Sequence, residues 1–165
     1  MTEKINTVEN SIQHQLFHKL GITSFANVVQ SKRMPVANAL QKPLVEATGT
    51  VFKLVSGTTE VIQEKKDSDG TVKEVSRAVY TVQPLNSKLL PANSEFAVKI
   101  KDSKSILTEQ INLDLLYNTK IFVITFEKLS HWTFQGSEGL NAKNVHIVDM
   151  NMQEFRKFMG ELSHE

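Results

Sequence analysis

Two histidines lie four residues apart near the start of the chain, in the stretch His14-Gln15-Leu16-Phe17-His18. On a helix this spacing places both imidazoles on one face, as a zinc site requires. A zinc protease carries a glutamate general base directly after the first histidine, but this chain has Gln15 there. Because no third ligand is apparent, we expect two solvated or half-buried histidines, and we predict neither a metal nor any other cofactor.

The acidic run Asp67-Ser68-Asp69-Gly70 resembles the start of a calcium-binding loop. Its twelfth position is Ala78, however, where such a loop needs a glutamate that binds through both oxygens. The run therefore predicts only a turn. No nucleophile elbow, phosphate-binding glycine loop or catalytic triad is recognisable, so we expect a protein that is not an enzyme.

Aromatic side chains beside lysines are the residues best suited to binding. Bases of single-stranded nucleic acid stack on aromatic rings, and lysines follow the phosphates. The candidate platforms are Trp132, Phe134 and Tyr80, with Phe96, Phe122 and Tyr117 as further aromatics. Phe96 and Phe122 lie in strand patterns and are expected in the core. For Trp132 and Phe134, which lie beside polar residues and Gly136, a place in the core and a place on a binding surface are equally open.

The candidate phosphate contacts are Lys99, Lys101, Lys104, Lys120, Lys128 and Lys143. A solvated surface is the simpler explanation for any one of them alone. Together with the aromatic residues they predict a surface that binds single-stranded nucleic acid.

The strongest strand signal runs from Lys120 to Lys128, where β-branched and aromatic residues make both faces apolar. Such a pattern is typical of a strand that is buried on both sides. Gly136 and Gly139 then allow a turn, and a second strand returns over residues 142–148. We expect one hairpin at the centre of a sheet.

The preceding residues alternate with the period of strands from Glu46 onwards. A turn at Ser56-Gly57, a polar turn over residues 64–70 and a loop over residues 86–94 separate the expected strands. The expected strands are 50–55, 58–62, 72–82 and 95–101, and a short helix or irregular crossover is expected over 105–117.

Helices are expected at both ends. Residues 3–20 have the apolar spacing of an amphipathic helix, whereas Pro35 and Pro43 bracket what we predict to be a loop with one helical turn. At the other end, Asn151 and Glu154 have the spacing of a capping box, and an apolar stripe runs from Met152 to Leu162. We expect this stripe to pack on the sheet; without room there, it would bind a partner.

These elements predict a mainly β protein with flanking N- and C-terminal helices, in the form of a small, partly closed antiparallel barrel. We favour a barrel of the oligonucleotide-binding (OB) type, with a sandwich as the rival. The expected organisation is a basic helical N-terminal extension over 1–45, a β-barrel domain over 46–149 and a C-terminal amphipathic helix over 150–165.

Composition limits the function classes. The 165 residues include no cysteine and carry a net charge of +1, with an excess of basic residues before position 46. A protein that grips duplex DNA through many phosphates is normally more basic. The polar first residues and the lack of an apolar run of about 18 residues predict a cytoplasmic protein without a membrane segment.

Five segments resemble a family of small accessory proteins encoded by conjugative elements and plasmids of Gram-positive bacteria. They are Gly57-Thr58-Thr59-Glu60-Val61, Arg77-Ala78-Val79-Tyr80-Thr81-Val82, 95–101, 120–126 and 139–148. The most specific of them is Ala142-Lys143-Asn144-Val145, followed by Ile147-Val148. Members of this family are linked to helicase processivity and to single-strand handling during rolling-circle replication and transfer. The resemblance implies that single-stranded DNA is a partner, together with a helicase or relaxase.

Two functions follow as hypotheses. The first is a single-stranded DNA-binding accessory protein of DNA replication or conjugative transfer in a mobile element. The second is a protein-interaction or assembly module of a phage or plasmid that does not bind nucleic acid, in which the end helices carry the contacts and form a homo-oligomer. Near-neutral charge and the methionines of the C-terminal stripe favour the second.

Overall fold

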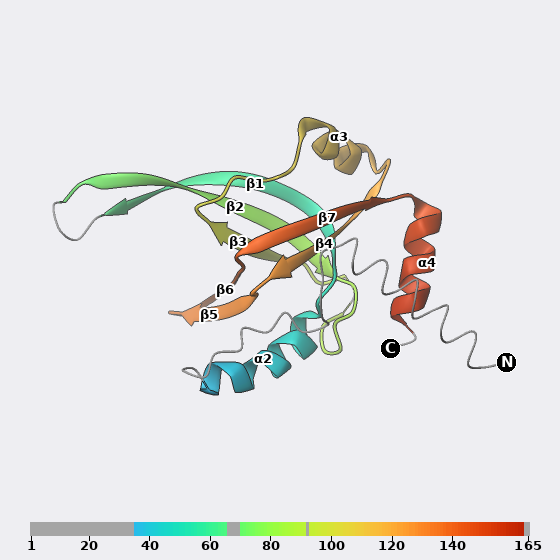
Figure 1. The fold of residues 1–165 in the computed structure, drawn as a ribbon, viewed down its shortest axis with the longest axis horizontal. Helices are drawn as coiled ribbons and strands as arrows, with labels where there is room; N and C mark the ends of the chain where they lie inside the picture. Colours follow the sequence, from blue (N-terminus) through green and yellow to red (C-terminus); the bar gives the residue numbers. More distant parts are fainter. Residues whose placement is uncertain (1–34, 66–69, 92, 164–165) are drawn as a thin grey trace.

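A computed structural model describes residues 35–65, 70–91 and 93–163. These residues form a mainly β fold, a seven-stranded sheet that curls into a half-barrel, with helices around it (Figure 1). The strands are β1 (Phe52–Lys65), β2 (Val72–Pro84), β3 (Phe96–Lys101), β4 (Ile121–Glu127), β5 (Ser130–Phe134), β6 (Ser137–Asn141) and β7 (Asn144–Met150). The helices are α2 (Pro35–Thr48), α3 (Glu109–Tyr117) and α4 (Met152–Leu162).

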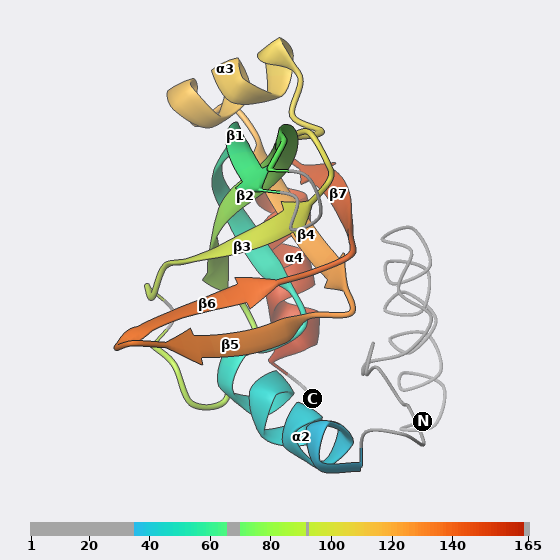
Figure 2. The same ribbon diagram turned by 90° about the vertical axis from the view of Figure 1, so that its left-hand side faces the viewer.

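The strand order in the sheet is β5-β6-β3-β2-β1-β4-β7. All neighbouring strands are antiparallel except β3 and β6, which pair in parallel at Val98–Leu140 and Lys99–Asn141. The chain crosses between the two ends of this order twice: β4, near one end, is followed by β5 at the other, and β6 is followed by β7. Figure 2 shows the β5–β6 hairpin beside β3.

Two apolar cores lie on the two faces of the sheet. The inner core gathers Phe52, Leu54, Tyr80, Val98, Phe122, Ile124 and Phe126, among others. The outer core lies under α4 and contains Val51, Val123, Val148, Met150, Phe158 and Leu162. β4 supplies both cores, which confirms the prediction of a strand buried on both sides. We use "inner" and "outer" for these two faces below.

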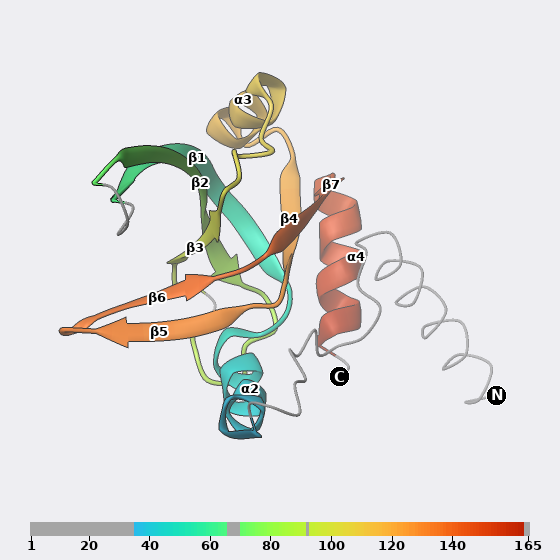
Figure 3. The same cartoon turned by 60° about the vertical axis from the view of Figure 1, so that its left-hand side comes forward.

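The C-terminal helix packs on the sheet, as its stripe predicts. Asn151 caps α4 by accepting the N–H of Glu154 at 2.8 Å, and Phe158 and Leu162 are buried against β4 and β7. Figure 3 shows α4 beside these two strands. Of the two alternatives for 105–117, a short helix or an irregular crossover, the structure shows the helix, which is α3 with Thr108 as its N-cap.

The predicted loop between Pro35 and Pro43 is wrong, because α2 runs through Pro43. Pro35 opens the helix, where its missing N–H costs nothing. The end of α2 is held by tertiary contacts: Leu44 packs against the inner core, and the N–H of Lys88 donates to the Glu46 carbonyl at 3.0 Å. These contacts offset the usual cost of an interior proline. The helix predicted over 3–20 lies outside the described residues.

The predicted turn at Ser56-Gly57 is also wrong. β1 continues through it, and a bulge at Val55 shifts the register against β2. A Cβ at Gly57 would approach Leu107 Cδ1 to 2.5 Å, so a larger residue there would have to displace the Leu107 side chain.

The antiparallel pairing of 120–128 with 142–148 is confirmed by β4 and β7, but these strands end the sheet order and do not lie at its centre. The connection between them is not a simple turn. Residues 130–141 form a second hairpin, β5–β6, that turns at Gln135 and Gly136. This hairpin reaches back to β3 and carries Trp132.

Candidate nucleic-acid interface

A strip of small residues crosses the outer face of four strands and ends at Trp132. The strand registers align Ser56 with Thr81, Thr81 with Ala97, and Trp132 with Gly139. Ala97 lies level with Gly139, one residue before the paired Val98 and Leu140. We call Ser56, Thr81, Ala97 and Gly139 the outer strip. Ser56 is exposed and the other three residues are half-buried, so among the described residues this part of the sheet is more open than the part under α4.

A second row of side chains lies beside the outer strip, on the same face of the sheet and two residues away on each strand. It contains Thr58, Val79, Lys99 and Asn141. Val79 and Lys99 alternate with the buried Ala78, Tyr80, Val98 and Ile100, which places them on the outer face. The Lys99 side chain makes no salt bridge within the described part of the chain, although its charge, after that of Arg77, helps to lower the pKa of the Glu60 carboxyl.

The next row holds charges that are already paired. Arg77 donates to Glu60 Oε2 from Nη2 at 2.6 Å and from Nε at 3.2 Å, and this hydrogen bond lowers the pKa of Glu60. Lys101 lies 2.7 Å from Glu64, and that contact raises the pKa of Lys101. The positive members of both pairs can contact phosphate only in competition with these carboxylates.

Trp132 lies at the end of the outer strip and is 37% exposed. Its indole covers Gly139, its partner on β6. Phe134 is the last residue of β5, where its backbone pairs with Ser137. The placement of the Phe134 side chain is outside what the structure describes, so its role as a platform stays a prediction.

Tyr80 is not available as a stacking platform, which corrects the expectation from sequence. Its ring is fully buried in the inner core against Phe126, and its hydroxyl accepts the N–H of Ile106 at 3.0 Å. Phe122 is buried in the same core, as expected. Tyr80 faces inward because strand alternation places it opposite to Val79 and Thr81.

The other predicted lysines are spread over the molecule. Lys104 is exposed after the end of β3. Lys128 and Lys143 are exposed at the breaks between β4 and β5 and between β6 and β7. The Ala142 N–H donates to the Lys99 carbonyl at 3.0 Å, and the Lys143 N–H donates to the Glu127 carbonyl at 2.9 Å. Three neighbouring backbone segments therefore carry, in spatial order, Lys99, Lys143 and Lys128.

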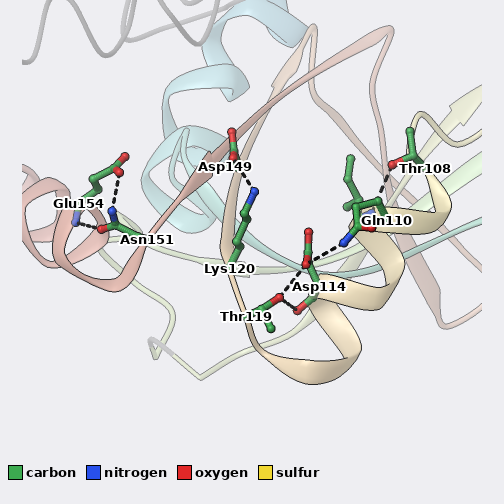
Figure 4. Close-up of polar contacts among 9 residues, drawn as sticks. Thr108, Gln110, Asp114, Thr119, Lys120, Asp149, Asn151 and Glu154 are labelled. Atoms are coloured by element: carbon green, nitrogen blue, oxygen red, sulfur yellow. Dashed lines mark hydrogen bonds and ion pairs between the residues drawn. The ribbon is translucent and has the colours of Figure 1, made fainter.

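Lys120 lies apart from this surface. It is next to the start of β4, which is separated from β3 by β1 and β2 in the sheet order. Its ammonium lies 3.4 Å from the Asp149 carboxylate (Figure 4). We therefore leave Lys120 out of the interface that the other residues outline.

Reasoning from sequence missed Arg77 and Gly139 as members of this surface. Arg77 could have been found from its alternation with the buried Ala78 and Tyr80. Gly139 could not, because its role depends on its register against Trp132.

Within the described ranges, no group of three or more histidine or acidic side chains is arranged to hold a metal ion, and no helix is long and apolar enough to cross a membrane. His14 and His18, for which we expect no metal, lie outside those ranges. Comparison of the chain with protein-family models, curated proteins and solved structures returned no match.

Proposed function

We propose that the half-barrel is of the OB type. The strand pairings support this assignment if residues 121–134 are taken as one broken strand and 137–150 as another. The sheet then has five strands. The first (β1) pairs with the second (β2) and with the fourth (β4 and β5), and the third (β3) pairs in parallel with the fifth (β6 and β7). α3 lies between the third and the fourth. Proteins of this type bind oligonucleotides on the second and third strands and on the neighbouring loops.

We further propose that the protein binds single-stranded DNA as an accessory factor in the replication or conjugative transfer of a mobile element, in the cytoplasm. The observation that carries this proposal is the outer strip, which runs over β2 and β3 to a partly exposed tryptophan and lies beside Lys99, a lysine without a salt bridge in the described part of the chain. Bases can lie over small side chains and stack on the indole, while Lys99 neutralises a phosphate. The family resemblance adds a helicase or relaxase as the protein partner.

Lys99 and Lys120 provide a matched pair for testing this surface. Replacing Lys99 by glutamine is expected to reduce the salt dependence of single-strand binding, lowering the slope of log K against log salt by about 0.7, because one phosphate contact is lost. Replacing Lys120 by glutamine should leave the slope unchanged. Fluorescence anisotropy titrations at several salt concentrations measure both. Equal slopes for the two variants would remove Lys99 from the interface.

One observation favours the protein-interaction alternative. The apolar stripe of α4 is packed on the sheet, but α3 exposes Leu113, Leu116 and Tyr117 at the spacing of one helical face. Such a stripe can pack against the same stripe of a second copy of the chain.

If this second candidate holds, Leu116→Ser should convert a dimer into a monomer in light scattering. Leu89→Ser is the control, because Leu89 is equally exposed, at 68% against 70% for Leu116, but lies in a loop. A wild-type chain that is monomeric at high micromolar concentration would count against association through α3.

A further inference from the structure

Gly139 is the residue on which the Trp132 indole rests. A Cβ at position 139 would lie 2.5 Å from Cζ2, 2.6 Å from Cε2 and 2.7 Å from Nε1 of Trp132. Real Cβ atoms essentially never approach heavy atoms so closely. Any other residue at this position must therefore move the indole or shift the strand.

The backbone of Gly139 gives no separate reason for a glycine. Among the described glycines, those with a positive φ are Gly49, Gly70 and Gly136, and Gly139 lies within the regular ladder of β5 and β6. An alanine could adopt this conformation. The close approach of the indole is what excludes a side chain here.

We infer that Gly139 is a positioning residue: because it has no side chain, the Trp132 indole can pack directly on β6 and form a platform for one unpaired base. We call this contact between Gly139 and the indole the seat. This inference rests on the proposed function. One side of the indole lies against the strand, and the remaining exposed part of the side chain faces solvent. A ring held in place before the ligand arrives loses little rotational freedom on binding, so the seat increases affinity without touching the nucleic acid.

Trp132 is the only tryptophan of the chain, so its fluorescence reports on the seat directly. In the free full-length protein, Gly139→Ala is expected to shift the emission to longer wavelength and to increase quenching by acrylamide. The same variant should bind a single-stranded oligonucleotide about 3- to 10-fold more weakly, since the displaced ring must be ordered on binding. Gly160→Ala is the matched control, because a Cβ at Gly160 meets nothing within 4 Å.

A double variant separates positioning from general damage. If Gly139 acts through Trp132, adding Gly139→Ala to Trp132→Ala should cause no further loss of affinity. A further loss as large as that in the wild-type background would overturn the inference. So would a Gly139→Ala protein with an unchanged spectrum and unchanged quenching.

The seat is also testable without any variant. Acrylamide should quench Trp132 less in the native protein than in the urea-unfolded chain, and equal quenching would contradict a seated indole. This result does not depend on DNA binding. A protected indole in a protein that does not bind oligonucleotides would therefore refute the proposed function and the platform, while the seating contact itself would stand.

Discussion

Replacing Trp132 by alanine is expected to weaken single-strand binding about 5- to 150-fold, which corresponds to the roughly 1–3 kcal/mol that stacking contributes per base. The indole is the largest partly exposed ring on the open part of the outer face. Anisotropy titration of a labelled oligonucleotide measures the loss. Trp132→Phe, which keeps a smaller ring, should fall between the wild type and the alanine variant.

The stability of these variants should change much less than their affinity, because more than a third of the Trp132 side chain is exposed in the native state. Urea unfolding checks this point. If Trp132→Ala binds as tightly as the wild type, the tryptophan is not part of the site. The proposal that the outer strip binds nucleic acid then loses its main support.

Phe158→Ala is expected to lower the free energy of unfolding by about 3–5 kcal/mol, the usual cost of truncating a buried phenylalanine. Phe158 is 2% exposed and packs in the outer core with Val123, Val148 and Met150. Because α4 closes this core, the loss affects the whole barrel, and urea denaturation followed by far-UV circular dichroism will detect it.

Met152→Ala is the control within the same helix, since Met152 is 54% exposed and its truncation should cost less than about 0.5 kcal/mol. Equal small effects for the two variants would mean that α4 does not pack on the sheet in solution. Its stripe would then again be a candidate surface for a partner, as in the second functional hypothesis.

The parts of the fold that could be predicted from sequence are those in which local pattern and tertiary environment agree. β4 is apolar on both faces because it supplies both cores, and β3 alternates because only its inner face is buried. α4 combines a capping box with an apolar stripe, and both features appear in the structure. In each case the pattern reports burial directly.

The parts that failed depend on contacts between distant residues. Pro43 predicts a break, but the packing of Leu44 and the hydrogen bond from the Lys88 N–H to the Glu46 carbonyl keep α2 helical. Ser56-Gly57 predicts a turn, but Leu107, fifty positions later, occupies the space that a side chain at 57 would need. Turn signals describe only what the local backbone allows, and such packing cannot be read from neighbouring residues.

The candidate surface was predictable only in part. Lys99 and Lys101 could be placed outward from the alternation of β3, and the structure places them so. The same alternation in β2 places Tyr80 on the inner face and Val79 on the outer face, which excludes Tyr80 as a platform. The link between Trp132 and Gly139 required the register of β5 and β6, which a glycine-rich segment does not specify.

We propose that the open outer face binds single-stranded DNA in preference to duplex. The most direct test is fluorescence anisotropy of one labelled oligonucleotide, titrated with the full-length protein as a single strand and as a duplex, at low and at moderate salt. We predict binding of the single strand that weakens as salt rises, and clearly weaker binding of the duplex. No binding of the single strand at micromolar protein and low salt, or equal affinity for both forms, would contradict the claim.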